Sequence, residues 1–322
     1  MIEEYRTRAL SAFHDLPVFA FYFSDPAAPE LRTAPVNVED WAWRVGVNHW
    51  EGPCADQIFP LFLERVDTTR IRALLTGAWY GEVAGEGIDA FHEALLEAAD
   101  RFPALEALFL SDIPQDMAEV SWIEQPDPGA LVAAFPRLRV LGVRGELSSK
   151  MKPLAHEGLE ELVLQTGGLP PGAVRALGES SLPALTRLEL YLGTKGYNGG
   201  ATAADLEPIL SGSAFPHLRH LGLRDAENAD DLAAALAHAP IVARLESLDL
   251  SLGALGDEGM SALLAGQPLT HLSRLDLHHH YMSPAMIERV RELLPEVRLD
   301  LDEALREERH NGRAYRYVAV AE

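Results

Sequence analysis

A spaced set of leucines recurs along most of the chain in the pattern L-x-x-L-x-L. Seven clear copies begin at Leu105, Leu138, Leu159, Leu185, Leu218, Leu245 and Leu272. Degenerate copies flank them at Ile71-Leu74-Thr76 and at Leu294-Val297-Leu299. The second and third leucines are separated by one residue, so on an extended strand their side chains point to the same face. The pattern therefore predicts about nine short strands whose leucines build one shared core.

Helix-length segments follow several of these predicted strands. They run from Asp230 to His238, from Asp257 to Leu264 and from Ser283 to Leu293. Each begins with Asp or Ser, which are preferred N-caps, and Pro284 suits a first helical turn. Successive copies start 21 to 34 residues apart, and a leucine-rich repeat takes about 20 to 29 residues. The sequence predicts an α/β leucine-rich-repeat solenoid, or horseshoe, with parallel strands on the concave face and helices on the convex face.

Both ends of the chain lack the repeat, and terminal units of a solenoid must shield its core from water. We expect an N-terminal β cap over residues 1–50, the solenoid over 51–300 and a C-terminal cap over 301–322. In the first cap, the aromatic segments Pro17 to Phe23 and Trp41 to Val47 predict two strands.

The C-terminal cap has two predicted elements. The charged segment from Glu303 to Glu308 indicates a helical link, with a turn at Asn311-Gly312. The segment from Arg313 to Val320 is rich in Tyr and Val and predicts a final edge strand.

The copy from Leu245 to Gly259 resembles the ribonuclease-inhibitor-like class of leucine-rich repeats, including Asp-Glu-Gly at the start of its helix. More narrowly, the chain resembles a family of bacterial leucine-rich-repeat proteins of unassigned biochemical function. The resembling blocks lie within roughly residues 70–285 and are Ser121–Gln125, Gln165–Leu169, Glu189–Gly193 and Leu275–His280. Members are associated with operons that encode radical-SAM and ATP-grasp-type enzymes. The resemblance implies an accessory role in modifying a peptide or small molecule.

The chain departs from the common repeat after the last leucine, where an Asn amide usually satisfies backbone groups at the turn. That position holds Gly167, Gly193, Ala226, Gly253 and His280. We therefore expect glycine geometry or water to satisfy these turns, and a curvature different from the common horseshoe.

Residues around the last two leucines of each copy are expected on the concave face. The middle column reads Phe109, Gly142, Val163, Glu189, Gly222, Asp249, Asp276 and Arg298. The next column reads Ser111, Arg144, Gln165, Tyr191, Arg224, Ser251, His278 and Asp300. The preceding column adds Arg187, His220, Ser247 and Arg274. One end of the face is apolar, and the other is a mosaic of carboxylates and arginines.

Two interpretations of this face remain open. It could be a solvated polar surface whose ion pairs contribute about 0–1 kcal/mol each. We favour a recognition surface on which Arg144, Tyr191 and Arg224 are exposed anchors, because Arg and Tyr are enriched at binding hot spots. The predicted binding residues are Arg144, Glu189, Tyr191, Arg224, Asp249, Asp276 and His278.

The run His278-His279-His280 raises the question of a metal site. Imidazole and carboxylate groups suit zinc, iron or manganese. On a strand, Asp276 and His278 share a face while His280 points inward, so we expect His280 to be a structural turn residue. The alternative is a metal-assisted enzyme centred on Asp249, Asp276 and His278. The favoured interpretation includes no metal and no other cofactor.

Composition narrows the function further. The formal net charge of -22 disfavours nucleic acid and anionic membranes, which are recognised mainly through Lys and Arg. A single cysteine, Cys54, permits no internal disulfide, and it is expected to be inert. The N-terminus has no signal-peptide pattern, and no apolar run is long enough to span a membrane. We expect a cytoplasmic protein.

No G-x-S-x-G elbow, Walker phosphate loop or H-E-x-x-H motif occurs. The insertion around Trp122 could be a binding loop or a local hydrophobic plug. The sequence therefore predicts a non-catalytic scaffold or adaptor that binds a protein or peptide on its concave face. It leaves the oligomeric state open.

Overall fold

The computed structural model describes residues 9–21, 35–46, 55–78, 86–311 and 313–321. Its main feature is a sheet of 12 strands whose order in space follows their order in the chain. Only β1 and β2 pair antiparallel; all the other neighbours in this sheet are parallel. The strands are β1 (Ala12–Phe13), β2 (Leu16–Phe21), β3 (Ala42–Val45), β4 (Ala73–Thr76), β5 (Ala107–Leu110), β6 (Val140–Arg144), β7 (Glu161–Gln165), β8 (Arg187–Gly193), β9 (His220–Ala226), β10 (Ser247–Asp249), β11 (Arg274–Asp276) and β12 (Arg298–Asp300).

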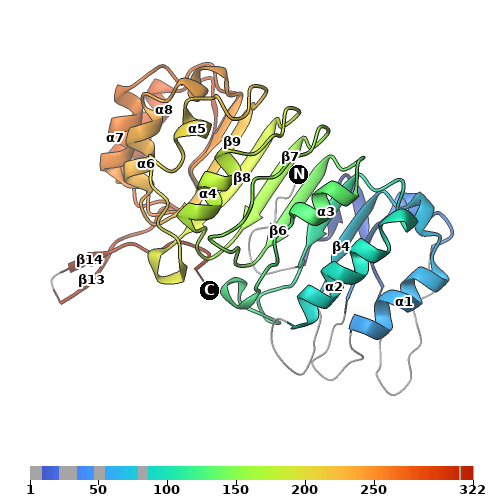
Figure 1. Ribbon diagram of the computed structural model, residues 1–322. Helices are drawn as coiled ribbons and strands as arrows, with labels where there is room; N and C mark the ends of the chain where they lie inside the picture. The colour runs from blue at the N-terminus through green and yellow to red at the C-terminus, as the bar shows by residue number, and fades with distance from the viewer. Residues whose placement is uncertain (1–8, 22–34, 47–54, 79–85, 312, 322) are drawn as a thin grey trace.

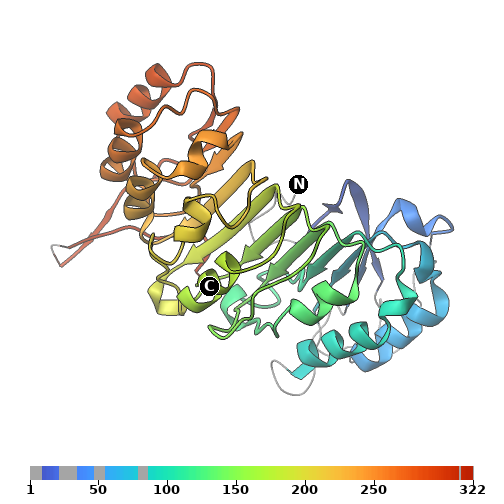
Figure 2. The same cartoon turned by 45° about the horizontal axis from the view of Figure 1, so that its top comes forward.

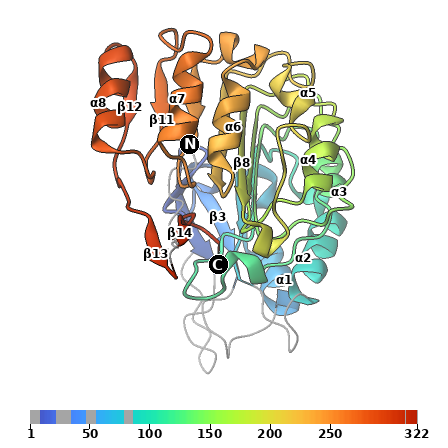
Figure 3. The same cartoon turned by 90° about the vertical axis from the view of Figure 1, so that its left-hand side faces the viewer.

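The α-helices all cover the same face of this sheet (Figure 1). They are α1 (Ala55–Arg65), α2 (Glu86–Glu97), α3 (Gly129–Ala134), α4 (Pro171–Gly178), α5 (Glu207–Leu210), α6 (Ala229–Leu236), α7 (Asp257–Ala265) and α8 (Pro284–Leu293). Successive helices follow one another along the sheet as the strands do (Figure 2, Figure 3). This is a mixed α/β fold of the solenoid type. No helix in the described ranges is long and apolar enough to cross a membrane.

The leucine pattern correctly predicts the strands β4 to β11 and their register. The second position of each copy pairs with the same position of the next, from Leu74 on β4 to Leu275 on β11. These side chains have no exposed surface. They pack beneath the helices because alternate residues of a strand face the same side. Burial by neighbouring repeats explains why one short strand can be stable here.

In the last copy, the predicted strand register is wrong by two residues. Leu299, not Val297, pairs with Leu275, so Arg298 lies beside Arg274 and Asp300 beside Asp276. The helix α8 continues to Leu293, and a backbone hydrogen bond from Val297 to Leu294 closes a turn before β12 begins. Leu294 and Val297 therefore belong to this turn, although their spacing imitates the motif.

The predicted helix starts are confirmed for α8 and modified for α6 and α7. Ser283 caps α8 by accepting a hydrogen bond from the amide of Met286, and Pro284 occupies the first turn. Asp230 instead reaches the next repeat, where its Oδ1 accepts hydrogen bonds from Gly256 and Gly259 at 2.8 and 3.1 Å. A Cβ at Gly259 would lie 2.4 Å from that carboxylate oxygen. The carboxylate thus caps the neighbouring helix α7 and links two repeats.

The C-terminal segment differs from its prediction. Glu303 has φ of 57°, a left-handed conformation that a helix does not accept. The expected helical link over Glu303–Glu308 is an irregular segment, which leads into a hairpin of β13 (Glu308–His310) and β14 (Arg313–Tyr315) that projects from the main body (Figure 1). The predicted edge strand ends early, at Tyr315.

Residues 316–321, which we call the C-terminal strap, run back across the loops that follow β11 and β10 and reach the end of β9. The Tyr317 amide donates to Tyr281 Oη at 2.8 Å. The Ala319 amide donates to the Leu252 carbonyl at 2.8 Å, and the Val320 amide to Asp225 Oδ1 at 2.8 Å. The strap therefore ties together the ends of three successive repeats.

At the N-terminus, β2 and β3 confirm two predicted strands, and they belong to the same sheet as the repeats. The predicted strand residues Tyr22, Phe23 and Val47 lie outside the described residues, as does Cys54. The domain boundaries at residues 50 and 300 stay predictions.

Candidate functional site

The sheet face opposite the helices, here called the open face, is partly covered by the chain itself. Leu10 and Phe13 pack against the side chains that β3 to β5 and β7 present there, including Leu75, Phe109 and Val163. The Phe13 and Phe109 rings meet edge to face, with centroids 5.9 Å apart. The apolar end of the predicted surface is therefore already filled by the hairpin of β1 and β2.

A buried carboxylate fixes this N-terminal segment. The side chain of Asp112 has no exposed surface, and both its oxygens accept the Leu10 amide at 3.1 Å. Arg44 Nε donates to the same carboxylate at 2.7 Å, and Arg44 Nη2 donates to the Leu10 carbonyl. A buried charge needs such partners because burial removes its hydration.

The other half of the open face, over β8 to β12, carries a hollow of about 670 Å³. Its side chains form rows that cross the strands in register. The first row holds Arg187, His220, Ser247, Arg274 and Arg298, and the second row holds Glu189, Gly222, Asp249, Asp276 and Asp300. A row with four cationic or imidazole side chains thus lies directly beside a row of carboxylates.

Glu189 is the centre of this arrangement. Its carboxylate contacts Arg187, lies 2.9 Å from Arg224 Nη1 and lies 3.2 Å from His220 Nε2. Burial alone would raise the pKa of Glu189, but His220, Arg224 and Arg187 outweigh it and lower the pKa. Gly222 leaves room for this cluster, because a Cβ there would lie 3.0 Å from Glu189 Cγ.

Arg224 and Tyr191 were predicted as exposed anchors, and the structure buries both. Their exposed fractions are 6% and 1%. The Arg224 guanidinium lies 5.0 Å from the centre of the Tyr191 ring and 3.4 Å from Asp249 Oδ2. Burial disfavours the charged Arg224, but Tyr191, Asp249 and Glu189 together raise its pKa. Burial raises the pKa of Asp249 despite this arginine.

Arg144 is also buried, so its predicted exposure was wrong as well. It has an exposed fraction of 7%. Its guanidinium donates to Gln165 Oε1 at 3.0 Å and to the Ile113 carbonyl at 2.8 Å, and lies 3.7 Å from Asp112. Arg144 therefore stabilises the plugged half of the face. Neither Arg144 nor Tyr191 lines the hollow, whereas Glu189, Arg224, Asp249, Asp276 and His278 do.

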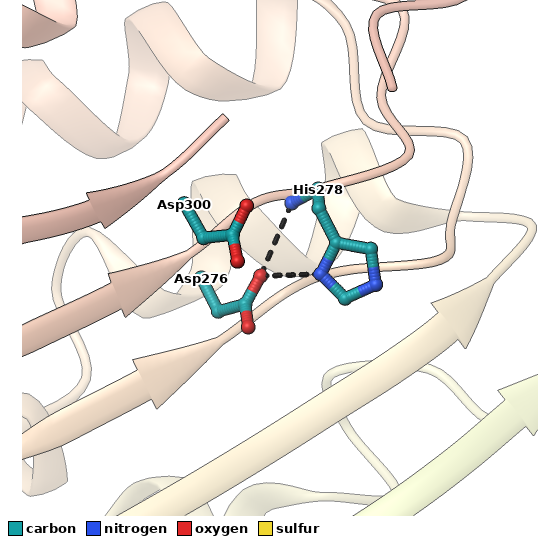
Figure 4. Close-up of side chains that lie close together, drawn as sticks. All are labelled: Asp276, His278 and Asp300. Carbon is teal, nitrogen blue, oxygen red and sulfur yellow. Dashed lines mark hydrogen bonds and ion pairs between the residues drawn. The ribbon is translucent and has the colours of Figure 1, made fainter. Parts of the chain in front are cut away.

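Asp276, His278 and Asp300 come together at the end of the hollow (Figure 4). His278 Nδ1 lies 2.6 Å from Asp276 Oδ1, which also accepts the His278 amide at 3.2 Å. One potential ligand atom from each of the three residues lies within 4.8 Å of the other two. Asp249, the third ligand of the predicted metal site, is replaced by Asp300 because of the two-residue shift in β12.

Arg274 competes for the same carboxylates. Its Nη2 atom lies 2.8 Å from Asp276 Oδ2 and 3.9 Å from Asp300 Oδ2. Burial would raise the pKa of Asp276, but His278 and Arg274 lower it. The inward side chain of His280 is bound to the Leu301 carbonyl and the Met282 amide. This confirms its structural role.

The sequence placed Arg187, His220, Ser247 and Arg274 on the correct face but did not select them as site residues. The sequence feature that could have identified them is their position, two residues before Glu189, Gly222, Asp249 and Asp276, because this position places all four in one row across the strands. Trp122 is 66% exposed and is the last residue of a short 3₁₀ helix (Val120–Trp122). A binding role for its loop stays a prediction.

No family model matches this chain, and no curated protein matches it. Among solved structures, a protein from Bacteroides fragilis is similar, with 27% identity and a TM-score of 0.76 over 86% of this chain and 76% of the other. A leucine-rich-repeat (LRR) protein from Leptospira interrogans has 11% identity and a TM-score of 0.19 over 81% of this chain and 90% of its own. The first likeness supports the α/β solenoid fold; the second carries no argument.

Proposed function

We propose that this protein binds another protein or a peptide in the hollow over β8 to β12 and acts as a scaffold that holds this partner. The observation that carries the proposal is the buried ion-pair network of Glu189, Arg224 and Asp249 beneath that hollow. A buried ion pair is a poor source of stability compared with apolar packing. Fixed charged groups beneath a hollow are, by contrast, well suited to recognising a polar ligand.

The rim of the hollow supplies groups that a partner can reach. Arg298 is exposed and the side chain of Arg274 is 33% exposed. Arginine presents five donors in a planar fork, which suits carboxylates and backbone carbonyls of a peptide. Long strand surfaces of solenoids commonly bind extended partners.

The finer architecture is part of this proposal. The repeated leucines support a leucine-rich-repeat horseshoe of the ribonuclease-inhibitor-like class, with a cap at each end. The family resemblance supports an accessory role beside enzymes that modify peptides or small molecules.

The experiment is a selection of peptides from a displayed random library on the immobilised protein, followed by titration calorimetry. Arg298→Glu should weaken the binding of the selected peptide by about 10-fold or more, which corresponds to roughly 1.4 kcal/mol of binding free energy. Arg291→Glu is the matched control, since its side chain is 56% exposed on α8, on the helical face. Equal affinities of the peptide for the wild type, Arg298→Glu and Arg291→Glu would refute binding in the hollow. Charge reversal at Arg144 or Arg224 is unsuitable because both are buried.

A second candidate is a metal-assisted enzyme, and the cluster of Asp276, His278 and Asp300 favours it. A histidine and two carboxylates suit zinc, iron or manganese. Elemental analysis of protein purified without a His-tag tests this candidate. Stoichiometric metal that disappears in His278→Ala would support it, and less than about 0.1 metal per chain after dialysis against zinc or manganese would oppose it.

A further inference from the structure

Ser247, His220 and Glu189 form a connected set on three adjacent strands. His220 Nδ1 lies 2.6 Å from Ser247 Oγ. His220 Nε2 lies 3.2 Å from Glu189 Oε1, within ion-pair distance, although Nε2 makes no well-aligned hydrogen bond within the described ranges. This is the order of groups found in nucleophilic catalysis: a hydroxyl, an imidazole that can take its proton, and a carboxylate that orients the imidazole.

The register of the sheet builds this arrangement. Ser247 on β10 is the direct neighbour of His220 on β9, which is the neighbour of Arg187 on β8. Glu189 follows Arg187 by two residues and therefore projects from the same face. Arg187 and Arg224 hold its carboxylate in place and ionised.

The hydroxyl and the imidazole are accessible. Both line the hollow, Ser247 is partly exposed, and the His220 side chain is 12% exposed. A ligand in the hollow can therefore reach Ser247 Oγ from the side of the sheet that has no helices. The set of Ser247, His220 and Glu189 includes none of the metal-ligand candidates and no residue of the N-terminal hairpin.

We propose that Ser247 is a nucleophile for acyl transfer from carboxylic esters, with His220 as its general base and Glu189 as a positioning residue. The imidazole would carry its proton on Nε2, beside Glu189, and accept the Ser247 proton at Nδ1. A bond forms between Ser247 Oγ and the acyl carbon, and the bond from that carbon to the alkoxy oxygen breaks. His220 returns the proton to the leaving alcohol. Water then hydrolyses the acyl-serine by the same proton transfers.

Arg274 is placed to stabilise the negative charge that develops on the carbonyl oxygen. It is the register neighbour of Ser247 on β11, and Asp276 holds its guanidinium at 2.8 Å. A fixed donor aimed at developing charge lowers the barrier more than one that must reorganise. The activity goes beyond scaffold binding, because it requires chemistry at one residue.

The test is labelling of the full chain with an alkyl fluorophosphonate. Ser247 Oγ attacks phosphorus, fluoride leaves, and His220 takes the proton. We expect the phosphonyl group on the peptide that contains Ser247, located by mass spectrometry. His220→Gln should slow labelling by roughly 100-fold, and Ser247→Ala should abolish it. Labelling at other serines only, or at an unchanged rate in His220→Gln, would overturn the proposal.

Two controls separate chemistry from folding. Ser213→Ala removes an exposed hydroxyl on the helical side of the fold, and it should label at the wild-type rate. Glu189→Gln should slow labelling, and Glu189→Asp should recover part of the rate because it restores the charge. Circular dichroism establishes folding for each variant. Fluorophosphonate labelling needs no bound peptide, so its failure is distinguishable from failure of the proposed scaffold function.

Discussion

The guanidinium carbon of Arg224 lies 5.0 Å from the centre of the Tyr191 ring, and both side chains are almost fully buried. They belong to neighbouring strands, at positions that pair directly in the sheet. The aromatic ring favours the arginine through its quadrupole, and Glu189 supplies the opposite charge. The pair therefore forms the floor of the open face, where the sequence suggested an exposed contact surface.

Removing the Arg224 charge should strongly destabilise the fold. In Arg224→Met, Glu189 loses its buried partner, and the free energy of unfolding should fall by about 3–5 kcal/mol. The double variant Glu189→Gln/Arg224→Met should recover part of this loss, because position 189 then carries no unpaired charge, while Asp249 still lacks its Arg224 partner. Urea titration measures both. A loss below about 1 kcal/mol for the single variant would mean that water already solvates Glu189.

The stacked leucine core predicts a large effect at Leu248, which has no exposed surface. Leu248→Ala should lower the free energy of unfolding by about 2–5 kcal/mol through lost burial and the cavity it leaves. The matched control is Leu293→Ala at the end of α8, where the leucine is 48% exposed. Leu293→Ala should lower the free energy of unfolding by about 0.5 kcal/mol or less. Similar losses at the two sites would contradict the stacked core.

Stability should depend on pH through His92 of α2. Burial lowers the pKa of His92 to about 4, and the nearby Gln125 side chain offsets only part of that effect. The unfolded chain binds its proton near pH 6.5, so between pH 6.5 and 4 it holds a proton that the folded chain does not. The free energy of unfolding should therefore decrease by about 3 kcal/mol as the pH falls from 6.5 to 4.

His92→Gln should therefore reduce the difference in unfolding free energy between pH 7 and pH 4, measured by urea titration. Substitution of the exposed His217 by Gln is the matched control and should retain the wild-type difference. If His92→Gln retains it too, protonation of His92 does not limit acid stability.

The C-terminal strap should loosen when one hydroxyl is removed. Tyr281 Oη donates to the Tyr317 carbonyl at 3.0 Å and accepts the Tyr317 amide at 2.8 Å. Tyr281→Phe removes both bonds, so opening of the strap should become easier by about 1–2 kcal/mol. Faster hydrogen exchange at the Tyr317 amide is the measurement, with Tyr315→Phe as control. Unchanged exchange would show that other contacts hold the strap.

The local leucine pattern was enough to predict the strands, because the second and third leucines of each copy lie on one strand and mark its buried face. Leu221 and Leu248 pair in register because both occupy the same place in the motif. The last repeat shows the limit of this reasoning. Leu294 and Val297 have the spacing of the first two positions of the motif, and only the end of α8 shows that they form a turn.

Contacts between distant segments could not be predicted in this way. Leu10 and Asp112 are 102 residues apart, and Val320 and Asp225 are 95 apart. Neither the segment around Leu10 nor the segment around Val320 has a periodic sequence pattern from which its contact could be predicted. As a result, the sequence predicted an apolar open surface that the N-terminal hairpin fills, and a terminal strand in place of the strap.

Burial of the arginines was missed for a related reason. A strand position gives the face on which Arg144 or Arg224 lies, but not how deeply its neighbours enclose it. Asp112 for Arg144, and Glu189 and Tyr191 for Arg224, come from other repeats. The row of Arg187, His220, Ser247 and Arg274 becomes visible only when the strand register is known.

The central claim is that a peptide partner occupies the hollow over β8 to β12. The most direct measurement is photo-crosslinking of a selected peptide to p-benzoylphenylalanine placed at Ser273, an exposed position that lines the hollow. The same group at Arg291 on α8 is the control. We expect the peptide to crosslink from position 273 and not from position 291. Crosslinking from 291 alone, with full affinity in both proteins, would place the partner on the helical face and contradict the account.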